Sequence, residues 1–227
     1  NVSSNATETR ISEGRLAQAN GGGARFAMVV PRAGKDNISI DATLDRMNAG
    51  NLIAALPKKD LREQLGDTEA DASGTLKISG APNQMSGIAD LRFGKGRLAG
   101  EPLQNLTAHA TFSGSTVTVD KVDANFDAGH LAGSGKFDTQ TQVFDLMAGG
   151  DRVQLDRLEA FAKRPGLPKV AGTAVIKELK ASGVFTDLAT YQISFEAAST
   201  DVTVDGHSAG RVTLVGRTEN RQLSITF

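Results

Sequence analysis

Apolar and polar residues alternate along most of this chain with a period of two. The alternation is clearest at 106–112, 116–120 and 122–126, and it returns at 131–137, 193–197, 202–204, 212–214 and 223–227. A period of two is typical of β-strands that have one apolar face and one polar face. We therefore predict a mainly β protein made of many short strands.

Short turn signals separate these segments. They consist of glycine, aspartate, asparagine and serine, as in 113–115, 127–129, 205–206 and 219–220. These residue types tolerate positive φ or form side-chain turns. Connections of this length favour antiparallel meanders over crossovers.

Two stretches break the alternation, at 47–56 and 153–162. Their apolar residues are spaced three and four apart, which predicts short helices with one apolar side. Each stretch is followed by basic residues and then by a proline or glycine. We expect both helices to end there.

The two predicted helices occupy matching places in an internal repeat with an offset of 106 residues. At that offset, 47–55 matches 153–161, 38–40 matches 144–146, and Gly100 matches Gly206. Once a longer loop in the first copy is allowed for, 72–75 matches 170–173 and 78–80 matches 181–183. We interpret the chain as repeat units 38–143 and 144–227. Residues 1–37 are left unassigned, apart from a candidate strand at 25–30. Stacked units of this kind build an elongated repeat protein rather than two compact domains.

Composition narrows the classes of function. Lysine plus arginine total 25 and aspartate plus glutamate total 26, so the net charge of −1 gives no field to attract nucleic acid. The absence of cysteine excludes disulfides and thiolate metal sites, and it is compatible with an oxidising compartment. No apolar run approaches the roughly 18 residues of a membrane span. Alternation continues to the last residues, which favours a piece of a longer protein.

Candidate catalytic and ligand motifs are weak. The glycine-rich segment 94–99 resembles a dinucleotide fingerprint, but strand-like alternation follows it where a helix is required. The segment 133–136 lacks the other residues of a phosphate loop. His109, His130 and His207 show no metal-ligand spacing, and paired aspartates such as Asp120 and Asp123 lack a calcium-loop signature. With no tryptophan and one tyrosine, a carbohydrate-active site is not supported. We predict no enzyme activity, no cofactor and no metal site.

The order of elements resembles the TamB/AsmA-like family of bacterial envelope proteins. The resemblance rests on the helical stretch 153–161, the segments 170–173 and 181–183, and the glycine-containing alternation at 126–135. It implies an elongated, curled, antiparallel β-sheet that forms an open groove. It also implies a periplasmic location, an inner-membrane anchor outside this chain, phospholipid as the partner, and outer-membrane biogenesis as the process.

If the resemblance holds, the apolar strand faces line a lipid groove. The residues expected to line it are Phe93, Leu106, Phe112, Val119, Phe126, Phe137, Phe195, Val204, Leu214 and Ile225. An acyl chain gains about 0.8 kcal/mol per buried methylene without needing a motif. The basic residues Lys58, Lys59, Lys163 and Arg164 would contact headgroups, or they would only complement the negative ends of the helices.

Two alternatives to lipid transfer remain open. The apolar faces could close on each other as a sandwich core, giving a structural or adhesive secreted β-repeat. The chain could also act as a scaffold that helps outer-membrane proteins assemble.

Overall fold

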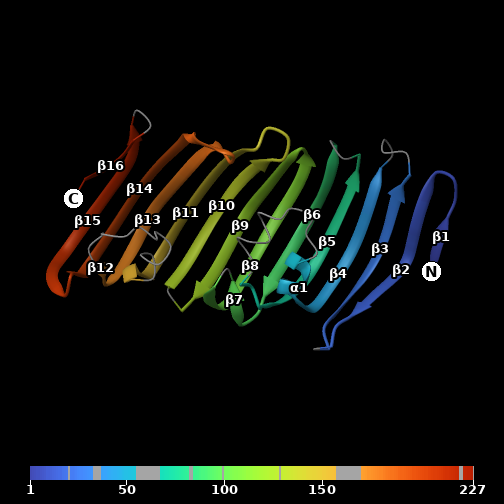
Figure 1. The fold of residues 1–227 in the computed structure, drawn as a ribbon, viewed down its shortest axis with the longest axis horizontal. Coiled ribbons are helices and arrows are strands. Elements are labelled where there is room, and N and C mark those ends of the chain that lie inside the picture. Colours follow the sequence, from blue (N-terminus) through green and yellow to red (C-terminus); the bar gives the residue numbers. More distant parts are fainter. Residues whose placement is uncertain are drawn as a thin grey trace.

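The computed structural model describes residues 1–19, 21–32, 37–54, 67–81, 84–98, 100–127, 129–156, 170–219 and 222–226. These residues form one sheet of sixteen strands and one short helix, α1 (Ala49–Ala54). The strands lie side by side from β1 (blue) to β16 (red), with α1 near β4 (Figure 1).

The strands have these bounds: β1 Val2–Ser4, β2 Glu8–Ala17, β3 Gly23–Pro31, β4 Ile38–Asn48, β5 Asp71–Gly80, β6 Met85–Phe93, β7 Gly96–Leu98, β8 Glu101–Gly114, β9 Thr116–Phe126, β10 Gly129–Asp138, β11 Val143–Gln154, β12 Val170–Ala171, β13 Thr173–Val184, β14 Asp187–Val204, β15 His207–Glu219 and β16 Gln222–Thr226.

Sheet order follows chain order, and the pairs are antiparallel. Two short strands lie off the main path, where β7 pairs with β8 and β12 pairs with β14. Tight hairpins such as Gly114–Ser115 between β8 and β9 leave no room for crossovers. The predicted mainly β, antiparallel fold is confirmed.

The sheet is open and forms a single layer in the described part of the chain. The extensive contacts between strands all join neighbours within the sheet. The accessible surface is 14,380 Å², whereas a compact protein of this mass exposes about 9,800 Å². The sheet therefore does not fold back to cover its own apolar face as a sandwich does.

Register places the apolar residues of successive strands on one face of the sheet. In β8, Leu106, Ala108 and Phe112 lie opposite Phe93, Leu91 and Gly87 of β6. On the other side, the same three residues lie opposite Ala124, Val122 and Val117 of β9. The opposite face carries the polar partners, for example Thr107 opposite Arg92 and Asp123.

β-Bulges keep this face in phase where the alternation in the sequence changes. In β9, Val119 pairs with Ala110 and Lys121 pairs with His109, so Asp120 is the extra residue. The segments 116–120 and 122–126 are thus one strand. Similar irregularities precede Met47 in β4 and Val153 in β11, next to Arg46 and Arg152, which have φ of 48° and 51°.

The predicted helices begin later than their apolar spacing suggested. Met47 and Asn48 still belong to β4, because the backbone of Met47 pairs with Ala72. The side chain of Asn48 then accepts a hydrogen bond from the Asn51 amide (3.1 Å), as helix N-caps do. Val153 and Gln154 likewise end β11. Residues 155–156 are helical, and the rest of that stretch lies outside the described residues.

The two helix starts occupy equivalent places in the sheet. Ile38 and Phe144 lie opposite Gly80 and Gly183, and Met47 and Val153 lie opposite Ala72 and Ala174. The matching of 72–75 with 170–173 was wrong by four residues. Register instead places Ala174 where Ala72 stands, so β12 (Val170–Ala171) corresponds to residues 68–69, where the Glu69 amide donates to the carbonyl of Arg97 (2.9 Å).

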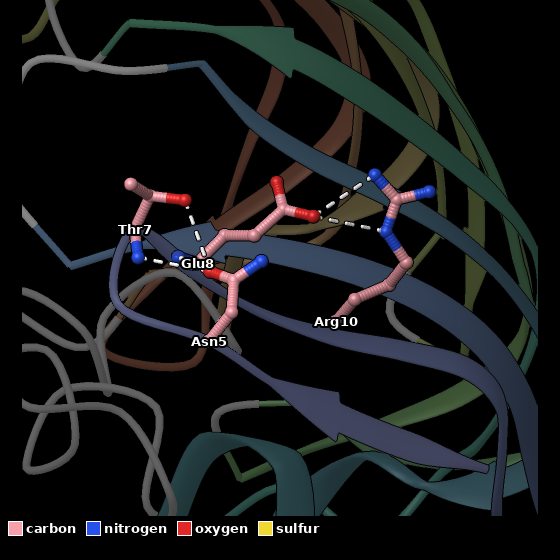
Figure 2. Close-up of polar contacts among 4 residues, drawn as sticks. All are labelled: Asn5, Thr7, Glu8 and Arg10. Atoms are coloured by element: carbon pink, nitrogen blue, oxygen red, sulfur yellow. Dashed lines mark hydrogen bonds and ion pairs between the residues drawn. The ribbon is translucent and has the colours of Figure 1, made fainter.

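The N-terminal region, unassigned from the sequence, adds β1, β2 and β3 to the same sheet. The candidate strand at 25–30 lies within β3. Asn5 closes the turn before β2, where its Oδ1 accepts hydrogen bonds from the amides of Thr7 (2.8 Å) and Glu8 (2.8 Å). Glu8 and Arg10 form an ion pair beside it (Figure 2).

Candidate functional site

The apolar face of the sheet forms what we call the trough. Its large side chains from β2 to β15 are half-buried, even at the centre of the sheet. They include Ile11, Phe26, Met28, Ile40, Leu44, Leu76, Ile78, Leu91, Phe93, Leu106, Phe112, Val117, Val119, Val122, Phe126, Phe137, Phe144, Leu146, Ile176, Leu179, Ile193, Phe195 and Leu214. In a closed core such side chains would be fully buried. The trough is therefore an exposed apolar surface of the kind that marks binding sites.

Two phenylalanine side chains of the trough lie over glycines of the neighbouring strand. Phe26 pairs with Gly14 and Phe195 pairs with Gly216 on neighbouring strands. A Cβ atom added to either glycine would collide with the partner ring. Each ring thus lies across the neighbouring strand instead of standing up from the sheet, which leaves space above the floor.

One rim of the trough has a buried apolar cluster near the start of α1. Met47, Ala49, Ala70, Ala72 and Leu103 are buried there, and the Ala49 amide donates to the carbonyl of Ala70 (2.8 Å). At the equivalent place in the second half, Val153, Ala174 and Val202 are buried. Most of the buried apolar residues of the described chain belong to these two clusters. The fully buried apolar residues are therefore concentrated at the rim of the trough and not on its floor.

Most of the residues predicted to line the groove lie in the trough. Register places Phe93, Leu106, Phe112, Val119, Phe126, Phe137, Phe195 and Leu214 on the apolar face. Val204 lies at the end of β14, where it pairs with Val170 and His207. The backbone of Ile225 pairs with Gly216, but its side chain lies outside the described residues. Lys58, Lys59, Lys163 and Arg164, the predicted headgroup contacts, also lie outside them.

The sequence-based selection missed other trough residues on strands it had noticed for different reasons. Phe144 and Leu146 were used only to define the repeat, although their spacing of two already carried the strand signal. Tyr191 and Phe185 were missed because their position depends on how β13 turns into β14. All four line a hollow in the trough with a volume of about 480 Å³.

The polar face carries histidines held between carboxylates. His109 Nδ1 lies 2.6 Å from Asp90 Oδ1, and its Nε2 lies 3.7 Å from Asp120. The hydrogen bond to Asp90 raises the pKa of His109 above its usual value. His130 lies between Asp123 (3.3 Å) and Asp151 (3.8 Å). Within the described ranges, no group of three acidic or histidine side chains is placed to hold a metal ion.

The glycine-rich motifs have structural roles. Gly96 begins β7, so the segment 94–98 opens a strand and not the helix that a dinucleotide site needs. Gly133 and Gly135 lie inside β10, where they face Ala148 and Leu146 of β11.

Asp201 accepts hydrogen bonds from the Thr173 amide (2.9 Å) and the Ser199 hydroxyl (3.0 Å), which lower its pKa. It lies inside β14 at the bulge between Ser199 and Val202, where it anchors the start of β13.

No family model, curated protein or solved structure matches this chain. Among the described residues, no helix has the length and apolar character needed to cross a membrane. A function for this chain is therefore inferred from the geometry of the trough.

Proposed function

We propose that this chain shields the acyl chains of phospholipid in its trough, as part of a periplasmic protein that serves lipid transfer and envelope biogenesis between the inner and outer membranes. The observation that carries the proposal is the open, single-layer sheet whose large apolar side chains are half-buried along one face. The resemblance to TamB/AsmA-like proteins supports the location and the process.

The energetics favour a hydrocarbon ligand. Covering the half-buried valine, leucine, isoleucine and phenylalanine side chains removes apolar surface from water, worth about 25 cal/mol per Å². An acyl chain makes the same gain along its own length, without directional contacts. The register supports this match, because apolar residues continue from strand to strand across the sheet.

The polar face suits a protein that works in water while its other face holds lipid. Threonine, aspartate and lysine residues such as Thr107, Asp123 and Lys136 occupy that face. The two faces differ over neighbouring strands, although single apolar side chains such as Ile88, Met147 and Val215 are exposed on the polar face. This difference supports a sheet with one face in contact with water and one face that holds an apolar ligand.

The decisive experiment is mass spectrometry of the folded protein after purification without detergent. We expect phospholipid to co-purify at a defined ratio. A double variant with Phe112→Asp and Val119→Asp places two charges in the trough and should lose the lipid. Its matched control, Thr111→Asp with Thr118→Asp, places the same charges on the polar face of the same two strands and should keep it.

Two results would contradict the proposal. A stable, monodisperse wild-type protein without lipid would favour a structural or adhesive β-repeat. Equal lipid content in the trough variant and in the polar-face control would mean that the trough does not hold the lipid. Circular dichroism of both variants checks that the sheet remains folded.

A further inference from the structure

The trough is not uniform along its length. Near the hairpin turns that follow β10 and β13, it deepens into the hollow of about 480 Å³, which lies over β9 to β14. We call it the aromatic hollow, and its apolar lining is Val117, Val119, Phe137, Phe144, Leu146, Ala181, Phe185, Tyr191 and Ile193. Its volume lies within the roughly 300–1,000 Å³ of ordinary small-molecule sites.

Aromatic pairs form the walls of this hollow. Phe137 and Phe185 meet edge to face with their ring centres 6.2 Å apart, and Phe144 and Tyr191 do so at 5.1 Å. Phe185 comes from the turn between β13 and β14 and remains 48% exposed. The exposed ring supplies apolar surface that a ligand can cover.

The described side chains of the hollow offer a ligand no free polar partner at depth. The hydroxyl of Tyr191 donates to the carbonyl of Phe185 (3.1 Å), so its hydrogen is already used. Lys136 and Asp145 border the hollow, but they are backbone partners in register positions that belong to the polar face of β10 and β11. A ligand with polar groups at that depth would lose hydrogen bonds to water without replacement, whereas an alkyl chain loses none.

Three turns at the end of the hollow are joined into one rim. The Thr139 amide donates to the Ser115 carbonyl (2.9 Å), and the Ser115 hydroxyl donates to Asp138 (2.6 Å). The Phe185 amide donates to the Gln142 carbonyl (2.9 Å). These bonds connect the β8–β9, β10–β11 and β13–β14 turns, so the hollow is preformed.

The rim is acidic. Asp138 ends β10 and Asp187 begins β14 beside these turns, and the segments 113–116, 137–143 and 184–191 contain no lysine or arginine. Lys136, the basic residue that borders the hollow, occupies a polar-face position opposite Thr118 and Asp145. Hydrogen bonds to the Asp138 carboxylate, led by the bond from Ser115, lower its pKa to about 2, so it stays charged at neutral pH. A negative rim favours a headgroup with a positive ammonium group and disfavours one that is only anionic.

We propose that the aromatic hollow is a holding site for one acyl tail of a phospholipid whose headgroup carries an ammonium group at the acidic rim. This proposal rests on the proposed function and adds a preferred position and a preferred class of lipid.

The protein provides its own reporter for this site. Tyr191 is its only tyrosine and it contains no tryptophan, so its ultraviolet emission at tyrosine wavelengths comes from the hollow. Phospholipids brominated in the middle of their acyl chains quench a fluorophore on contact. We expect brominated phosphatidylcholine, added to delipidated protein, to quench Tyr191. Phosphatidylglycerol with the same chains should require about two- to fivefold higher concentration, as expected for one exposed charge contact.

Two matched variants separate the hollow from the rest of the trough. Phe185→Ser removes one wall of the hollow, and Leu16→Ser removes an equally accessible side chain (55% exposed) at the distant β2 end of the same face. We expect Phe185→Ser to at least halve the quenching and Leu16→Ser to leave it unchanged. Asp187→Asn should reduce the preference for phosphatidylcholine, because its amide oxygen can still accept the Ala189 hydrogen bond while the charge is gone.

Total bound lipid, measured by mass spectrometry on the same samples, distinguishes the two proposals. Lipid bound without quenching of Tyr191 would overturn the holding site and leave the proposed function intact. No bound lipid at all would overturn both. Equal quenching by the two lipids would overturn the assignment of the headgroup.

Discussion

Asp138 illustrates how single polar residues stabilise the turns of this sheet. Its Oδ1 accepts hydrogen bonds from the Gln140 amide (2.9 Å) and from the amide (2.7 Å) and hydroxyl (3.0 Å) of Thr141. Its Oδ2 accepts from Ser115 in the neighbouring turn (2.6 Å). All four bonds favour the ionised carboxylate, which is the physical reason for its low pKa of about 2.

This low pKa predicts an acid-sensitive contribution to stability. Because the pKa of Asp138 is lower in the folded protein than in the unfolded chain, its contribution is complete above about pH 4 and is lost as the pH falls towards 2. Urea midpoints measured at pH 7 and pH 3 should differ less for Asp138→Asn than for the wild type. The outer-face carboxylate Asp145 offers a control substitution, Asp145→Asn. An equal pH dependence in the wild type and Asp138→Asn would contradict the assignment.

Residue identity alone could not have revealed this role. The sequence places Asp138 between a strand and the polar segment 139–142, like many turn aspartates. Its bond to Ser115 joins residues 23 positions apart, and it forms only because β9 and β10 pair in one register. Local patterns carry no information about such bonds between turns.

At the scale of whole strands, the bulge in β9 decides which face each residue joins. The sequence showed two alternating segments whose phases differ, and the structure joins them through Asp120. Deleting Asp120 alone would leave Val119, Lys121 and Val122 in regular alternation. Deleting both Asp120 and Lys121 would put Val119 next to Val122 and turn half of the strand over.

We therefore expect a sharp contrast between these two deletions. Deletion of Asp120 should change the free energy of unfolding by less than about 1 kcal/mol, since both faces are kept. Deletion of both residues should cost about 3 kcal/mol or more, because apolar side chains such as Val122 and Phe126 would turn to the polar face. Chemical denaturation with circular dichroism measures both. Similar losses in the two variants would mean that the bulge does not set the phase.

The strand pattern was therefore a good guide to faces and a poor guide to boundaries. Alternation predicted the inward residues of β8, β9 and β10, because strand side chains obey a period of two whatever lies around them. It did not predict that Met47 and Val153 end strands, because the choice between strand and helix there depends on pairing with Ala72 and Ala174. It also gave no sign of the long, well-paired β2 in the unassigned N-terminal region, where Gly14 and Arg15 interrupt the apolar pattern.

For the molecule as a whole, a single open layer changes how unfolding depends on denaturant. The folded protein already exposes 14,380 Å² of surface, so unfolding exposes less new surface than it would for a compact protein. Using the same scaling of surface with mass, the new surface is about a fifth smaller. Since the denaturant m-value depends on this area, we expect an m-value about a fifth below that of a compact protein of equal length.

Equilibrium denaturation in urea tests this expectation, with dilution of the protein as the control for self-association. An m-value typical of a compact protein, unchanged on dilution, would mean that the apolar face is covered in solution. The sequence could not decide this point. Alternation predicts a face that avoids water, but it is the same whether a second sheet, a lipid or another molecule covers that face.

Because each strand contacts mainly its two neighbours, the number of strands in the sheet can change without disturbing a common centre. A globular protein cannot gain or lose a hairpin without remaking its centre, since every element meets there. Here a hairpin could be inserted or removed between β6 and β11, and the strands on either side would meet a new neighbour through the same backbone ladder. Evolution could thus change the length of such a sheet one hairpin at a time, without redesigning the strands that are already there.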